Sequence, residues 1–178
     1  MIMKNKALFL DRDGTLIQHV PYLHRIEDVK LLEPVITFVQ SYQERGYIPI
    51  MITNQSGVAR GMFDEEAVQQ VNAHVCKLLA AEGITIAACY YCPHHHTKAT
   101  IQAYAITCTC RKPQTGMLLQ AAADFDIDLN QSIMLGDSQC DWDAGRAAGC
   151  QVINVAHLRA DPLLLQTTAD SMFAQQKE

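Results

Sequence analysis

Two aspartates lie two positions apart directly after a short apolar run near the start of the chain. Residues 7–10 (Ala-Leu-Phe-Leu) precede the segment Asp-Arg-Asp-Gly-Thr at 11–15. Side chains two apart on an extended backbone point the same way, so Asp11 and Asp13 are predicted to converge at the carboxyl end of a strand, where open α/β sheets bind ligands. Gly14 permits a sharp turn there. In isolation, such a motif is more often a polar turn that ends a strand.

Polar groups at the ends of two later strands change this interpretation. Residues 53–57 (Thr-Asn-Gln-Ser-Gly) and 136–138 (Gly-Asp-Ser) each follow an apolar run, so we expect them at the same edge of the sheet. Asp137 would then join Asp11 and Asp13. Two or three carboxylates with water suit Mg²⁺, which prefers oxygen ligands. Lys112 can supply the cation that a phosphoryl group needs, so the pattern predicts metal-assisted chemistry on a phosphate.

A loop rich in cysteine and histidine precedes this lysine. It offers three thiolates and one imidazole, a set suited to tetrahedral Zn²⁺: Cys92, His94, Cys108 and Cys110. The alternative is a group of free thiols beside a solvated histidine run. Ordering the loop costs roughly 1–2 kcal/mol per residue in backbone entropy, and a structural zinc returns about 10–16 kcal/mol in small peptides. This favours a structural zinc that fixes Arg111 and Lys112 in place.

The elements that must position these residues alternate between strand and helix patterns, which indicates a parallel α/β sheet. Asp64 can cap a helix, and glycines follow the predicted ends of others. The predicted strands cover residues 7–10, 47–53, 84–91, 133–135 and 151–155, and the predicted helices cover residues 34–45, 65–82, 115–125 and 140–148. A short helix and an edge element are expected after Asp161. We expect one domain over residues 1–178.

Composition narrows the range of partners. The chain has 178 residues, 49% of them hydrophobic, and a formal net charge of −5, which argues against a nucleic-acid partner held by phosphate contacts. No segment approaches the roughly 18 apolar residues of a membrane span, and the apolar run at 7–10 is too short for a signal peptide. Seven cysteines without an export signal favour thiols and metal ligands. We therefore expect a cytoplasmic protein, without a membrane partner, that acts as a monomer.

Taken in order, these motifs resemble those of the haloacid dehalogenase superfamily. The resemblance rests on residues 11–15, Thr53, Lys112 and residues 136–141 (Gly-Asp-Ser-Gln-Cys-Asp). It implies a Rossmann-like three-layer sandwich. It also implies that Asp11 is a covalent nucleophile and that Asp13 is the general acid and base. The implied catalytic set is Asp11, Asp13, Thr53 and Lys112, and the implied Mg²⁺ ligands are Asp11, Asp13 and Asp137.

The sequence departs from many relatives in one place, because Ser138 stands where they carry a lysine. Lys112 is then expected to act alone. Asp141 has two interpretations, as a cap for the following helix, with capping-box spacing to Ser138, or as support for the metal site. No insertion after the first strand is long enough for a large cap domain, which argues against a phosphomutase.

The zinc loop and residues 53–61 (Thr-Asn-Gln-Ser-Gly-Val-Ala-Arg-Gly) narrow the resemblance to the D-glycero-D-manno-heptose 1,7-bisphosphate 7-phosphatases. The resemblance implies a small phosphorylated sugar as substrate and a role in making the heptose of lipopolysaccharide. It implies these substrate contacts: His19, Tyr22, Thr53, Asn54, Gln55, Ser56, Arg111 and Lys112. Two alternatives remain open, a histidinol-phosphate phosphatase and a non-catalytic zinc-stabilised binding module.

Overall fold

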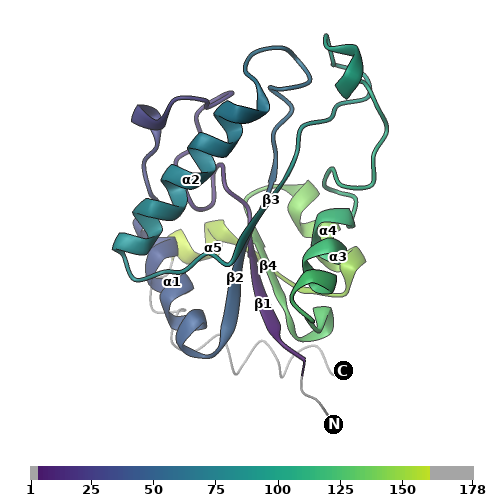
Figure 1. Cartoon of the computed structure of the whole chain (residues 1–178). Helices are drawn as coiled ribbons and strands as arrows, with labels where there is room; N and C mark the ends of the chain where they lie inside the picture. The colour runs from purple at the N-terminus through teal and green to yellow at the C-terminus, as the bar shows by residue number, and fades with distance from the viewer. Residues whose placement is uncertain (1–3, 161–178) are drawn as a thin grey trace.

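Apolar segments of the chain form a parallel sheet in the computed structural model, which describes residues 4–160 and the side chains up to residue 158. Within that range the sheet has five strands in the order β3-β2-β1-β4-β5 (Figure 1). All neighbouring strands run parallel. Their bounds are β1 Lys6–Leu10, β2 Tyr47–Asn54, β3 Ala88–Cys92, β4 Ile133–Gly136 and β5 Gln151–Asn154.

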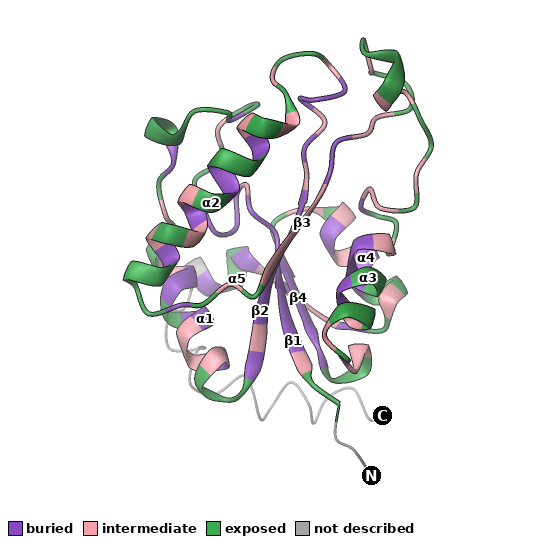
Figure 2. Ribbon diagram, in the orientation of Figure 1, coloured by how far each residue is buried: buried purple, intermediate pink, exposed green. Residues whose placement is uncertain are grey.

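Helices cover both faces of this sheet (Figure 1). One face carries α1 Glu33–Glu44, α2 Glu65–Ala81 and α5 Val155–Ala160, and the other carries α3 Gly116–Asp124 and α4 Gln139–Ala148. The remaining helical turns are η1 Ile26–Asp28, η2 Gln102–Tyr104 and η3 Leu129–Gln131. The strands are largely buried and the outer helix faces are exposed (Figure 2). The predicted three-layer α/β sandwich is therefore confirmed.

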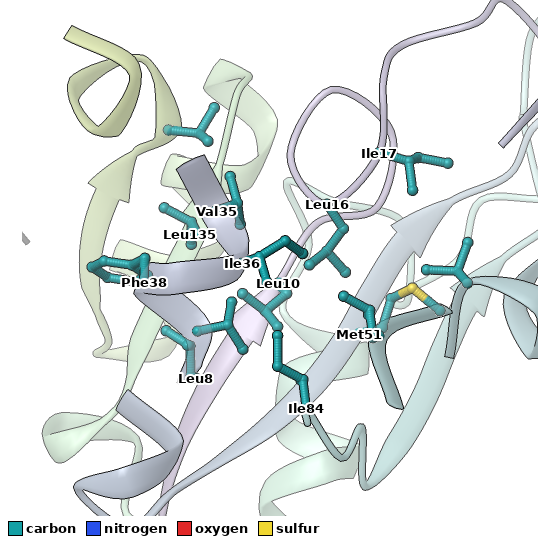
Figure 3. Close-up of a cluster of buried hydrophobic side chains, with 14 of the residues drawn as sticks. Leu8, Leu10, Leu16, Ile17, Val35, Ile36, Phe38, Met51, Ile84 and Leu135 are labelled. Atoms are coloured by element: carbon teal, nitrogen blue, oxygen red, sulfur yellow. The ribbon is translucent and has the colours of Figure 1, made fainter. Parts of the chain in front are cut away.

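Alternation along the strands divides the core into two clusters. Leu8 and Leu10 of β1 pack in the cluster beneath α1, α2 and α5, part of which is drawn in Figure 3. Ala7 and Phe9 pack in the cluster beneath α3 and α4. Because β1 is central and buried on both faces, its sequence is a continuous apolar run. Its carboxyl end, where the polar residues begin, is thereby fixed against both layers.

Most element boundaries agree with the sequence patterns. The Asp64 side chain accepts a hydrogen bond from the backbone N–H of Ala67 at 2.9 Å and caps α2. Gly149 ends α4 with a left-handed backbone, φ +91°. The predicted start of the third strand was wrong, because β3 begins at Ala88. Ile84 instead donates its backbone N–H to Leu79 O at 2.9 Å, so this stretch closes the end of α2 before the strand begins.

The connections that follow β1, β2 and β3 all lie beyond the same end of the sheet, the end formed by the carboxyl ends of the strands (Figure 1). The connection from β1 to α1 contains only the turn η1, so it holds no large cap domain. None of the helices described is long and apolar enough to cross a membrane. The short helix and edge element predicted after Asp161 lie outside the described residues.

Candidate active site

A buried lysine stands between two carboxylates at the carboxyl edge of the sheet. The Nζ of Lys112 lies 2.6 Å from Asp11 Oδ1 and 2.6 Å from Asp141 Oδ1, and it donates to Ile52 O at 2.8 Å. Lys112 is 2% exposed and Asp141 is 1% exposed. A charge at this depth is tolerated only when it is paired and hydrogen-bonded, and here both conditions are met. Three separate parts of the chain therefore meet at one point: the end of β1, the end of the zinc loop and the first turn of α4.

Burial shifts the protonation equilibria of this cluster. It raises the pKa of Asp11 to about 7, with Lys112 opposing the shift and Asp141 adding to it. Burial alone would lower the pKa of Lys112, but the attraction of both carboxylates outweighs it and the pKa is raised. The pKa of Asp137 is also raised, by burial and then by Asp141. One lysine thus faces several carboxylates, an arrangement that a second cation would stabilise.

The carboxylate oxygens of Asp11, Asp137 and Asp141 lie within 4.8 Å of one another. An all-oxygen set of this kind fits Mg²⁺, and the exposed Asp137 leaves room for the waters that Mg²⁺ retains. Gly14 makes this approach possible, because a Cβ at this position would lie 2.1 Å from Asp137 Oδ2. Gly14 also has φ +85°, which favours glycine.

The side chain of Asp13, which was predicted as a metal ligand, is not part of this group of three. Its carboxylate forms an ion pair with Arg12, at 2.9 Å from Nη2 to Oδ2. It also accepts a hydrogen bond from Gln55 Nε2 at 2.7 Å, and the same amide donates to Thr53 Oγ1 at 2.9 Å. These contacts hold the Asp13 side chain outside the group, whose third member is Asp141.

The structure confirms the capping interpretation of Asp141 and places its other oxygen against the buried lysine. Oδ2 accepts the backbone N–H of Ser138 at 3.1 Å, and the two residues form a capping box at the start of α4. Oδ1 faces Lys112. One carboxylate therefore joins the helix terminus to the buried lysine. Because the cap fixes the side chain, it also fixes the position of the oxygen that faces the site.

Two adjoining hollows open beside this cluster and contain most of the predicted substrate contacts. The first, of about 200 Å³, is lined by Asp11, Asp13, His19, Thr53, Asn54, Lys112 and Asp137, among others. The second, of about 370 Å³, is lined by His19, Tyr22, Asn54, Gln55 and Ser56, among others. Asp13, His19 and Asn54 border both. Because the two hollows share these lining residues, together they form a recess with space for a ligand longer than a single phosphate.

Two predicted substrate contacts also have structural partners. Asn54 exchanges two hydrogen bonds with the backbone of Lys112, each of 3.0 Å, and so fixes the lysine's main chain. Arg111 lines neither hollow and donates from Nη1 to His94 O at 3.4 Å. Arg111 therefore lies against the loop that is rich in cysteine and histidine.

The four predicted zinc ligands come together in space. The sulfur of Cys92 lies 3.5 Å from that of Cys108 and 3.2 Å from that of Cys110, and the Nδ1 of His94 lies 3.6 Å from Cys92 and 3.4 Å from Cys110. Sulfurs bound to one tetrahedral zinc, with Zn–S of about 2.3 Å, lie roughly 3.8 Å apart. The set therefore fits Zn²⁺, and protein atoms supply all four positions.

The loop that carries these ligands is joined to the recess by main-chain and side-chain contacts. The backbone N–H groups of Thr100 and Ile101 both donate to Ala59 O, at 2.8 and 3.0 Å. Glu65, in the first turn of α2, accepts hydrogen bonds from the hydroxyls of Tyr91 and Tyr104, each at 2.7 Å. Ordering the loop therefore also orders the segment around residues 55–61, which borders the second hollow.

Three polar residues near the site were not singled out from sequence. Arg12 and Asn72 are both buried, and Arg60 holds its guanidinium 5.5 Å from the ring of Tyr22. The Nε of Arg60 is buried without a hydrogen-bond partner among the described residues. A signal for Asn72 was present, because it falls on the apolar face of α2 among buried valines. The signal for Arg12 was weaker, because it consists only of a cation two residues after the end of a buried strand.

Comparison with known proteins agrees with this geometry. The HAD-hydrolase-like family model matches residues 109–171. The chain is 39% identical to the D-glycero-beta-D-manno-heptose-1,7-bisphosphate 7-phosphatase of Photorhabdus laumondii, over 92% of each chain. It is 43% identical to the protein of that name from Haemophilus influenzae, over 81% of this chain and 77% of the relative. The fold and site thus define a phosphatase of the haloacid dehalogenase superfamily.

A solved structure extends the likeness to three dimensions. The D,D-heptose 1,7-bisphosphate phosphatase from B. bronchiseptica, complexed with magnesium and phosphate, superposes with a TM-score of 0.73 at 26% identity, covering 96% of this chain and 99% of that one. Together with the relatives above, this shows that the chain belongs to the family of heptose-1,7-bisphosphate 7-phosphatases.

Proposed function

We propose that this protein hydrolyses the C7 phosphate of D-glycero-D-manno-heptose 1,7-bisphosphate and leaves the 1-phosphate for nucleotide activation in the synthesis of lipopolysaccharide heptose. The single observation that carries the chemistry is the buried Lys112 between Asp11 and Asp141, beside a recess that contains most of the other predicted polar groups. The names of the relatives support the choice of substrate.

In the proposed reaction, an oxygen of Asp11 attacks phosphorus and the bond from phosphorus to the C7 oxygen breaks. Asp13 gives its proton to that departing oxygen. Water then attacks the aspartyl-phosphate and loses a proton to Asp13, and the bond between phosphorus and Asp11 breaks to release inorganic phosphate. Lys112 and the hydroxyl of Thr53 stabilise the phosphoryl oxygens as charge develops on them.

A carboxylate attacks an anionic phosphate only when cations reduce the repulsion between them. Lys112 supplies one such charge, and it already contacts Asp11 at 2.6 Å. Mg²⁺ held by Asp11, Asp137 and Asp141 would supply the rest by neutralising charge on the phosphoryl oxygens. Asp13, outside this group, keeps its carboxylate available for proton transfer at the border of both hollows.

We propose that the cations Arg60 and Arg111 receive the second phosphate of the bisphosphate. The pKa of the half-buried His95 is lowered by burial and then by the positive charges of Arg111 and Arg60. Guanidinium groups bind phosphate in a bidentate geometry, and the Nε of Arg60 lacks a hydrogen-bond partner within the described structure. His19, Tyr22 and residues 53–56 would contact the sugar between the two phosphates.

The zinc in this proposal is structural, because four protein ligands leave no open position for substrate. It would hold the loop that carries Arg111 and Lys112. Thiolate ligands are retained in a reducing compartment, which supports a cytoplasmic location.

The test is phosphate release measured side by side on heptose 1,7-bisphosphate, as both anomers, and on histidinol phosphate. We expect Mg²⁺-dependent release from a heptose bisphosphate, with kcat/KM at least tenfold above that for histidinol phosphate. Preference for histidinol phosphate would assign the chain to the alternative activity. Absence of Mg²⁺-dependent hydrolysis on these and on a broad panel of phosphoesters would instead favour a non-catalytic binding module.

A further inference from the structure

The largest fully buried side chain in the described structure is a cation inside the aspartate loop. Arg12 is 1% exposed, although it lies between the two aspartates of the proposed reaction. Its Nη1 donates to Asn72 Oδ1 at 2.8 Å, and its Nη2 lies 2.9 Å from Asp13 Oδ2. Burial of a guanidinium is costly unless its donors are satisfied, so these two partners account for its position.

The carboxylate of Asp13 is held from two sides. Arg12 contacts both of its oxygens, with Nε donating to Oδ2 at 3.1 Å and Nη2 donating to Oδ1 at 3.3 Å. Gln55 donates to Oδ2 at 2.7 Å. The Asp13 side chain remains 20% exposed and borders both hollows. The contacts therefore fix the orientation of the carboxylate without removing it from the recess.

Asn72 has no direct access to the recess. It lies on α2, is 5% exposed and lines neither hollow. Its neighbours on the same helix face are Val68, Val71 and Val75, so a polar side chain there is unfavourable unless it is hydrogen-bonded. The contact with Arg12 supplies that hydrogen bond. The hydrogen-bonded route from Asn72 to the recess therefore runs through Arg12 to Asp13.

We propose that Arg12 and Asn72 are positioning residues for proton transfer. Asn72 fixes the guanidinium of Arg12, which with Gln55 holds the Asp13 carboxylate where it can reach the departing oxygen. This inference rests on the proposed role of Asp13 as general acid and base, but not on the identity of the sugar. Such preorganisation matters most when the leaving group is a poor one, because a sugar alkoxide needs a proton to depart and p-nitrophenolate does not.

The variant Asn72→Leu removes the acceptor and keeps an apolar side chain on the buried helix face. We expect kcat/KM to fall about 10–100-fold on heptose bisphosphate, within the range of a general acid's contribution, and less than about threefold on p-nitrophenyl phosphate. Asn72→Asp keeps an acceptor oxygen and should restore most of the loss. Gln70→Leu, at an exposed position on the same helix, is the matched control and should leave both values unchanged.

A second readout needs no sugar substrate. Asp13 also activates the water that hydrolyses the phosphoenzyme, so the Asn72→Leu variant should accumulate the phosphoenzyme. In a rapid-quench experiment this variant should therefore show a burst of p-nitrophenolate equal to the enzyme concentration. The native enzyme should show no such burst. Asn72→Ser, which withdraws the acceptor from Arg12, carries the same test if the leucine variant does not fold.

Equal losses on both esters without a burst would overturn the inference and assign Asn72 a purely structural role, and so would no loss on either ester. Native enzyme that hydrolyses p-nitrophenyl phosphate but not heptose bisphosphate would refute the proposed substrate. The burst would then still decide the role of Asn72.

Discussion

Replacement of Lys112 by methionine removes the cation that stands between two buried carboxylates. Both Asp11 and Asp141 lie 2.6 Å from its Nζ, and all three residues are less than a tenth exposed. Methionine has a similar length and leaves no large cavity, so the change mainly removes charge. In Mg²⁺-free protein the two carboxylates are then buried without their principal partner.

Removal of one member of a buried ion pair costs roughly 3–5 kcal/mol of folding free energy. For a domain of this size, each kcal/mol lowers the unfolding midpoint by about 2–4 °C, so the expected loss is about 6–20 °C. Addition of Mg²⁺ should stabilise the variant more than the native protein, because the ion offsets carboxylates that no longer face a lysine. Activity should fall below detection in either condition.

The assay is urea and thermal unfolding followed by the fluorescence of Trp142, the lone tryptophan, whose Nε1 donates to Gly136 O at 3.0 Å beside the site. Buffers should be depleted of Mg²⁺ without a chelator, so that zinc is retained. Lys77→Met, at an exposed position on α2, is the control and should change stability by less than about 0.5 kcal/mol. A Lys112→Met protein within about 1 kcal/mol of native stability without Mg²⁺ would refute the reasoning, given the size of an ordinary core effect.

Three further predictions concern the metals and the substrate. The Cys110→Ser variant should lack stoichiometric zinc in elemental analysis and show faster amide exchange around Arg111. The control Cys150→Ser lies outside the loop and should retain its zinc. Full zinc content in the Cys110→Ser variant would contradict the proposed ligand set. Burial raises the pKa of Asp11 to about 7, and Mg²⁺ binds the deprotonated carboxylate. The Kd for Mg²⁺, measured by calorimetry, should therefore rise about tenfold from pH ~8 to pH ~6. A Kd that stays constant over this range would be inconsistent with this cause. Arg60→Met should raise KM for the bisphosphate about tenfold and for p-nitrophenyl phosphate less than about threefold, as expected for one lost charge-assisted contact; equal effects would exclude a role at the second phosphate.

The sheet and its polar edge could be predicted because the signals are local. Residues 7–10 form an uninterrupted apolar run, Asp64 has capping chemistry, and Gly149 follows the last turn of its helix. The cluster of three cysteines and one histidine could be predicted for a chemical reason, since few ligand sets satisfy a tetrahedral ion. These inferences needed no knowledge of distant contacts.

The orientation of Asp13 could not be predicted in the same way. Alternation along an extended chain placed Asp13 beside Asp11, and both line the smaller hollow, but it gave no sign of the ion pair between Asp13 and Arg12. The Arg12 guanidinium also donates to Asn72, which is far away in sequence and reaches Arg12 only when α2 packs on the sheet. Spacing alone carries no information about such a contact. The same holds for Asp141, whose second oxygen meets Lys112 only in the folded chain.

Mass spectrometry of the Asp13→Asn variant, quenched during reaction with p-nitrophenyl phosphate, tests the central claim most directly. If Asp11 is the nucleophile and Asp13 activates water, the peptide that contains residue 11 gains one phosphoryl group in this variant, and the Asp11→Asn protein shows neither that adduct nor turnover. Sustained hydrolysis by Asp11→Asn, or a phosphoryl group on a different residue, would contradict the account.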